Sequence, residues 1–176
     1  MADIADPKSL AEKAEGVYQE GDFESAARLY GEAASAFQAL GNPLDAAEMH
    51  NNQSVAFLQA GNAQAAFEIA AGTAEVFAAA KDTRRQGIAL ANEATPLQSL
   101  GRLDQAIEKY LQSAEAFKQA GEDQLHASVM QAVAWIHLRQ GKIFLALSDI
   151  RVGLADVKNP TFTQKIMKGL LRLRLW

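Results

Sequence analysis

Apolar side chains recur along most of the chain at the spacing of one face of a helix. Leu10, Ala14 and Val17 follow one another at intervals of four and three residues, and the same intervals return between residues 90 and 97. Such intervals place side chains on one side of an α-helix. No segment shows the alternation of apolar and polar residues that marks a half-buried strand. The pattern predicts an all-α chain, with helices of about 18 residues between short polar breaks.

The breaks between these helices repeat with a fixed period. Glycines stand 40 residues apart and each opens a similar phrase, at Gly21, Gly61, Gly101 and Gly141. Half a period later comes a second series of turn residues, at Gly41, Lys81 and Gly121. Self-similarity at such a period is typical of a repeat array. We therefore expect one domain over residues 1–176, with helix pairs at about 7–40, 41–80, 81–120 and 121–158 and a further helix at about 161–175.

Certain residue types return at fixed places in each pair. The first helix carries a small residue, at Ala14, Ser54, Ala94 and Ala134, and the second carries an alanine, at Ala26, Ala66, Ala106 and Ala146. Together with the turn glycines, these positions resemble the tetratricopeptide repeat (TPR) family, and the 40-residue period is similar to the lengthened repeats of kinesin light chain-type scaffolds. The resemblance implies a right-handed α-solenoid of four TPR-like helix pairs plus a C-terminal capping helix. The chain departs from the family before the small residue, where leucine is usual and Lys13, Gln53, Glu93 and Val133 stand.

Composition narrows the class of protein further. The chain of 176 residues is 49% hydrophobic and contains no cysteine, which excludes disulfides and thiol chemistry. Its net charge of −4 is uneven, because residues 1–157 carry −9 and residues 158–176 carry +5 with no acid. An acidic body argues against a nucleic-acid partner. No apolar run approaches the roughly 18 residues that a membrane-spanning helix needs, so we expect a cytoplasmic protein.

Few residues offer chemistry. Of the three histidines, His126 and His137 lie on nearly one helical face but about 16 Å apart along the axis, too far to share a metal ion. The glycines follow the repeat period and form no phosphate-binding loop. We therefore expect no enzymatic activity, no metal and no cofactor.

The resemblance also implies a binding surface, because the first helices of TPR pairs line the concave groove. Carried over by repeat position, the candidate groove residues are Asn51, Asn52, Val55, Gln59, Asn92, Thr95, Gln98, Gln131, Trp135 and Arg139. Side-chain amides both donate and accept hydrogen bonds, as an extended peptide requires of its groove. Asn52 and Asn92 share one repeat position and either bind a partner backbone or hydrogen-bond neighbouring helices. Trp135 is either a ligand anchor or packs against the last helix. The sequence thus favours a non-catalytic module for a protein or peptide partner.

The last helix is the most asymmetric part of the sequence. Its stripe of Phe162, Ile166, Leu170 and Leu173 is expected to cover apolar groups of the preceding helix, such as Phe144, Leu147 and Leu154. Because the helix is also basic, binding to a partner or to an anionic membrane stays open as an additional role. The alternative function is a self-associating scaffold, in which the basic helix pairs with an acidic repeat surface of another copy. We expect a monomer or a weak homo-oligomer.

Overall fold

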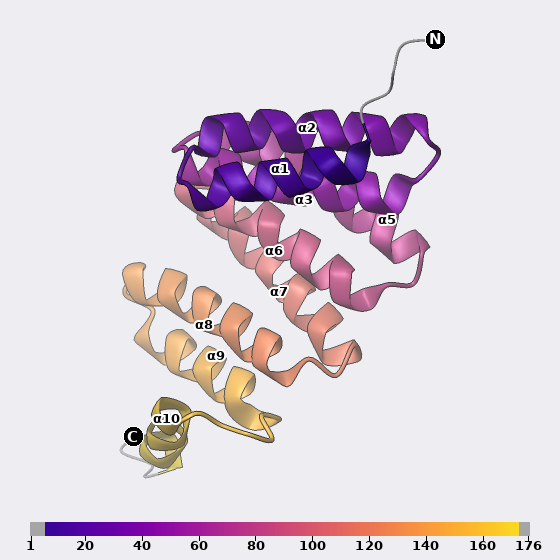
Figure 1. Ribbon diagram of the computed structural model, residues 1–176. Helices are drawn as coiled ribbons and strands as arrows, with labels where there is room; N and C mark the ends of the chain where they lie inside the picture. Colours follow the sequence, from indigo (N-terminus) through magenta and orange to yellow (C-terminus); the bar gives the residue numbers. More distant parts are fainter. Residues whose placement is uncertain (1–5, 173–176) are drawn as a thin grey trace.

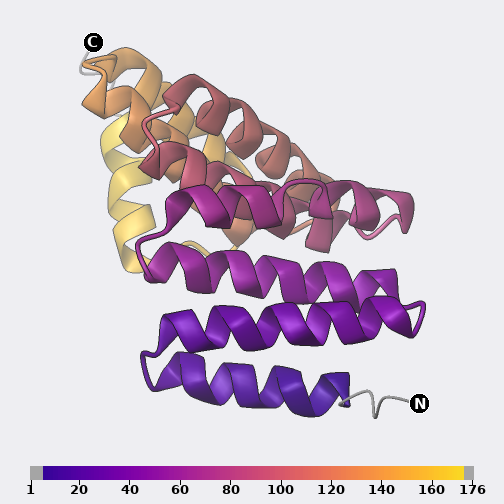
Figure 2. The ribbon, with the colours of Figure 1, turned by 90° about the horizontal axis from the view of Figure 1, so that it is seen from above.

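The computed structural model describes residues 6–172, and all regular secondary structure in that range is helical. The helices are α1 (Pro7–Gln19), α2 (Phe23–Ala39), α3 (Pro43–Gln59), α4 (Ala63–Ala70), α5 (Thr73–Ala79), α6 (Thr83–Ser99), α7 (Leu103–Gln119), α8 (Asp123–Arg139), α9 (Ile143–Ala155) and α10 (Phe162–Arg172). The two helices of each pair pack antiparallel, with α4 and α5 together forming the second helix of the second pair, and successive pairs stack with a progressive turn (Figures 1 and 2). The prediction of an all-α solenoid is confirmed.

From α1 to α9, the turns between helices share one compact geometry, apart from the break between α4 and α5. In the first, the Gly21 N–H donates to the Tyr18 carbonyl at 3.0 Å and the Asp22 N–H to the Val17 carbonyl at 3.2 Å, the Schellman pattern. That pattern needs a left-handed residue, and Gly21 supplies it with φ of 86°. The Asp22 carboxylate then accepts the Ser25 N–H at 3.1 Å and caps α2. One residue therefore ends one helix and begins the next, which keeps the turn short.

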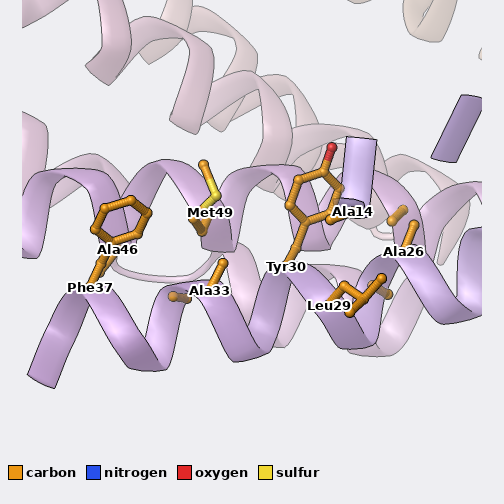
Figure 3. Close-up of a cluster of buried hydrophobic side chains, with 11 residues drawn as sticks. Ala14, Ala26, Leu29, Tyr30, Ala33, Phe37, Ala46 and Met49 are labelled. Atoms are coloured by element: carbon orange, nitrogen blue, oxygen red, sulfur yellow. The ribbon is translucent and has the colours of Figure 1, made fainter. Parts of the chain in front are cut away.

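Small side chains let the helices approach closely. Ala14, Ala26 and Ala33 are fully buried where α1, α2 and α3 meet, and the rings of Tyr30 and Phe37 fill the space between them (Figure 3). Since the cluster is mostly alanine, there is little room for a larger side chain at these positions.

The second pair departs from the expected pattern. Its second helix is broken into α4 and α5 at Ala71, whose ψ of 125° leaves the helical region, and Gly72, whose φ is 87°. The repeat pattern predicts an unbroken helix here. Gly72 lies outside the period of the turn glycines, which is why the repeat pattern did not reveal the break.

The last helix lies across the end of α9 (Figure 1), but in a different orientation from the one expected. Met167 packs against a buried cluster that contains Leu154, whereas Phe162 is 78% exposed and Phe144 is 77% exposed. The prediction that the Phe162 stripe covers α9 is therefore wrong, and Leu173 lies outside the described residues. The inner face of α10 is partly polar, because the Gln164 amide donates to Gln124 Oε1 at 3.0 Å and Lys168 Nζ donates to the Val157 carbonyl at 3.2 Å.

Candidate protein-binding surface

The first helix of each pair, α1, α3, α6 and α8, contributes to one surface, which we call the first-helix face. Its candidate residues divide by exposure. Gln59, Gln131, Trp135 and Arg139 are exposed, and Asn52, Val55, Asn92, Thr95 and Gln98 are half-buried. Nine of the ten predicted residues therefore reach solvent from this face.

Asn51 is the exception. It is 5% exposed, and its Oδ1 accepts a hydrogen bond of 3.0 Å from the Thr73 hydroxyl, which also donates to the Ala70 carbonyl. Asn51 thus holds α3 to the broken segment between α4 and α5. Its place in the candidate groove is not supported, because a buried side chain with an internal partner does not meet a ligand.

Asn52 and Asn92 are different from Asn51. Neither side chain makes a hydrogen bond to another residue within 6–172, and the same is true of Gln131. The alternative in which the two asparagines satisfy neighbouring helices is therefore not what the structure shows. Three amides on the first-helix face keep their donors and acceptors available.

A tyrosine of the second helix fixes two other candidates. The Tyr110 hydroxyl donates to Gln98 Oε1 at 3.2 Å and lies 3.1 Å from the Thr95 hydroxyl, itself a donor to the Ala91 carbonyl. Burial raises the pKa of Tyr110, so the hydroxyl stays protonated. This contact leaves the Gln98 amide nitrogen available while holding its side chain in place.

The first pair repeats this contact with a charged partner. Tyr30, at the same repeat position as Tyr110, donates to Glu15 Oε2 at 2.7 Å. This hydrogen bond is the largest cause that lowers the pKa of the Glu15 carboxyl below 4.5, and a second one from Gln19 adds to it. Burial, with the contact to Glu15, raises the pKa of Tyr30. A tyrosine bridge from second helix to first helix is therefore a recurring device of this solenoid.

Trp135 is the largest aromatic side chain exposed on the first-helix face. It is 58% exposed, and Leu138, one turn further along α8, is 46% exposed. The buried cluster against which Met167 of α10 packs consists of Ala127, Leu154 and Val157, and it includes neither Trp135 nor Leu138. Of the two readings of Trp135, packing against the last helix is not what the structure shows.

Two buried or partly buried polar pairs were not expected. Glu93 is 2% exposed, and its Oε2 lies 2.5 Å from Lys109 Nζ, while its Oε1 has no hydrogen-bond partner among the described residues. His137 Nδ1 lies 2.6 Å from Asp149 Oδ2. Each pair joins the first and second helix of one repeat. The departure from leucine at Glu93 was the sequence signal for the first pair, and nothing in the repeat pattern pointed to the second.

A groove on the second helices was also missed. It has a volume of about 570 Å³ and lies between α5, α6 and α7, where Glu75, Glu108 and Glu115 line it together with Leu90 and Leu111. Lys and Arg are absent from its lining residues, and we call it the acidic groove. The three glutamates belong to the solvent side of their helices, where acids look like ordinary surface residues in sequence.

Other kinds of site find little support. Within residues 6–172, histidines and acids form no group of three that could hold a metal ion. Across the same range, each helix is too short or too polar to cross a membrane.

Stacked helix pairs with a largely uncharged first-helix face define the class: a TPR-like helical-repeat scaffold. A model of the family "Soluble NSF attachment protein, SNAP" matches residues 7–163, and the chain belongs to this family. No curated protein sequence matches the chain significantly.

Two solved structures agree with that class. BtubC (BKLC) from P. vanneervenii superimposes with a TM-score of 0.76 at 19% identity, over 94% of this chain and 71% of that one. A putative kinesin light chain from Podosopora anserina, described as having nearly identical TPR-like repeats, gives a TM-score of 0.76 at 14% identity, over 97% and 86% of the two chains. Identities this low show the fold alone, and they confirm the resemblance to kinesin light chain-type repeats.

Proposed function

We propose that this protein is a non-catalytic interaction module, which binds a peptide or an extended segment of a protein partner along its first-helix face. The observation that carries the proposal is the exposed Trp135 on the same first-helix face as three amides, Asn52, Asn92 and Gln131, that make no hydrogen bond within the described residues.

The chemistry of these side chains suits an extended backbone. Each amide offers a donor and an acceptor, matching the N–H and C=O groups that alternate along a peptide. Asn52 and Asn92 occupy the same repeat position in successive pairs, which gives a partner regularly spaced contacts. Trp135 adds an apolar anchor, and exposed aromatic residues of this kind dominate many interfaces.

The family match supports the same class of function. The family's printed name describes an attachment protein, and helical-repeat scaffolds of this type generally mediate protein–protein interaction. The partner is therefore a protein segment rather than a small molecule.

Selection from a random peptide library against the immobilised protein tests the proposal. The affinity of a selected peptide is then measured by calorimetry for the wild type, for Asn52→Ala/Asn92→Ala and for Trp135→Ala. We expect each variant to bind at least about tenfold more weakly, since the loss of one anchor or two hydrogen bonds exceeds 1.4 kcal/mol.

The matched control is Gln38→Ala/Gln105→Ala, which removes two exposed amides from second helices α2 and α7. This variant keeps the wild-type affinity if the first-helix face is the site. Selected peptides that bind all four proteins equally, or a library that yields no binder, would contradict the proposal.

A further inference from the structure

The outer face of α10 is apolar although the helix already packs on the solenoid. Phe162, Ile166 and Leu170 follow at intervals of four residues and are 78%, 49% and 54% exposed, whereas Met167 on the other side contacts α9. Such a stripe on an exposed helix is unusual unless something covers it.

The segment that contains this stripe is basic. Residues 158–176 carry five basic residues and no acid. Lys165 is exposed, and Arg172 follows it after seven residues, which is two turns of a helix. The helix thus combines an apolar stripe with basic residues spaced by two turns.

The acidic groove has the complementary features. Its apolar part includes Leu111, which is 45% exposed, and its two rim glutamates on α7, Glu108 and Glu115, are also seven residues apart. Each accepts a hydrogen bond from a neutral glutamine one turn on, Gln112 at 3.3 Å and Gln119 at 3.0 Å, which fixes the carboxylates and leaves their charge in place.

The acidic groove and α10 also match in length. The groove follows α7 from Glu108 to Gln119, a distance of about 16 Å, and α10 is about 15 Å long at the helical rise of 1.5 Å per residue. We propose that the exposed apolar and basic face of α10 docks into the acidic groove of a second copy of this chain.

The positions of α10 and the acidic groove in the fold indicate that the contact forms between two copies of the chain. α10 lies at one end of the solenoid on α9, and the groove lies between α5 and α7 in its middle (Figure 1). Two copies either exchange their α10 helices in a closed dimer or continue head to tail. The contact uses none of the candidate residues of the first-helix face and goes beyond the proposed function.

Sedimentation velocity of the full chain across protein concentration and salt is the first test. At low salt we expect association that strengthens with concentration, and at 0.5 M salt we expect it to weaken about tenfold or more, because the contact depends on charge.

A charge exchange then identifies the two surfaces. Glu108→Lys/Glu115→Lys and Lys165→Glu/Arg172→Glu should each weaken association about tenfold or more, because each replaces attraction by repulsion. An equimolar mixture of the two variants should associate again. Glu24→Lys/Glu68→Lys makes the same charge change on α2 and α4, outside the groove, and controls for net charge.

Leu111→Ser tests the apolar part of the contact, with Leu40→Ser, at an exposed leucine outside the groove, as its control. We expect only the first to weaken association. A wild type that stays monomeric at about 100 μM in low salt overturns the proposal. It is also overturned if the mixed charge variants fail to associate, or if α10 binds anionic vesicles while the protein remains monomeric.

Discussion

The first and last helix pairs use the same repeat positions but close the solenoid in different ways. In α1–α2 the interface is built from alanines at 0% exposure, such as Ala26 and Ala33, with Phe37 only 7% exposed. In α9 the same repeat position is also a buried alanine, Ala146. The larger residues Ile143, Leu145 and Val152 nevertheless remain about half exposed.

This difference separates two tasks of a repeat position. The buried alanine sets how closely two helices approach, and both ends have it. The neighbouring large apolar residues need a further layer to cover them, and only the N-terminal end is largely covered within the described chain. The C-terminal end therefore holds both Trp135 and the outer face of α10, the two surfaces to which we assign partners.

The largest expected contrast between the ends lies at one repeat position. Phe37→Ala should lower the free energy of unfolding by about 3–5 kcal/mol, because it leaves a cavity among α1, α2 and α3. Val157→Ala, at the corresponding position beside α10, should lower it by about 1.5 kcal/mol, because only two methyl groups leave a buried site. Urea unfolding of both variants measures the difference, and equal losses would contradict this ranking.

Disrupting a side-chain hydrogen bond between helices should destabilise the last helix pair more than the first. Asp149→Ala removes the hydrogen-bond partner of His137 in a pair whose side chains are 14% and 15% exposed, and should cost about 1–3 kcal/mol. Glu15→Gln changes the partly buried bridge to Tyr30 but keeps a side-chain oxygen that accepts its hydrogen bond, and should cost about 0.5 kcal/mol. Thermal unfolding of the two variants compares them, and a larger loss for Glu15→Gln would reverse the ranking.

Two neighbouring substitutions on α10 test its orientation, and their expected effects on stability are smaller. Met167→Ala should destabilise the chain by about 1 kcal/mol, because the methionine is partly buried against Leu154. Ile166→Ala, one residue away, should be nearly neutral in the monomer, because Ile166 is 49% exposed. The opposite outcome would restore the orientation that the sequence pattern favours.

The smallest effect concerns pH at the N-terminal bridge. Because the folded pKa of Glu15 is lowered, its contribution to stability is present above the unfolded value of about 4.5 and is lost as pH falls through the folded value. Tyr30→Phe should raise the pKa of Glu15 toward 4.5 and reduce that acid-dependent loss. An NMR titration of the Glu15 carboxyl carbon follows the shift, and an unchanged pKa would mean that Gln19 alone holds the carboxylate.

The sequence predicted those parts of the fold that depend on local rules. Turn glycines such as Gly21 are recognisable because few other residues accept a positive φ, and the period then placed every described helix pair in order. Lys81, with φ of 59°, adopts the same conformation without being glycine, and only the period located that turn. The repeat boundaries themselves stay a prediction.

What the sequence missed depends on rotation about a helix axis. Asn51 and Asn52 are adjacent, yet one is buried against Thr73 and the other is not, because one residue corresponds to about 100° of rotation. The apolar arc of α10 includes both the Phe162 stripe and Met167, so hydrophobicity alone did not decide which side packs. The break at Gly72 and the acidic groove beside it occur in one repeat only, so the repeat pattern did not predict them.

The three-residue turns have a mechanical consequence. Since one residue such as Asp22 ends a helix and caps the next, the chain from α1 to α9 has almost no slack between helices, and each helix is held mainly by its neighbours in sequence. A tension applied to the two ends therefore reaches the helix interfaces directly and loads them in series. The interface with the fewest partners, between α9 and α10, is expected to part first, and the pairs behind it to follow in order toward α1.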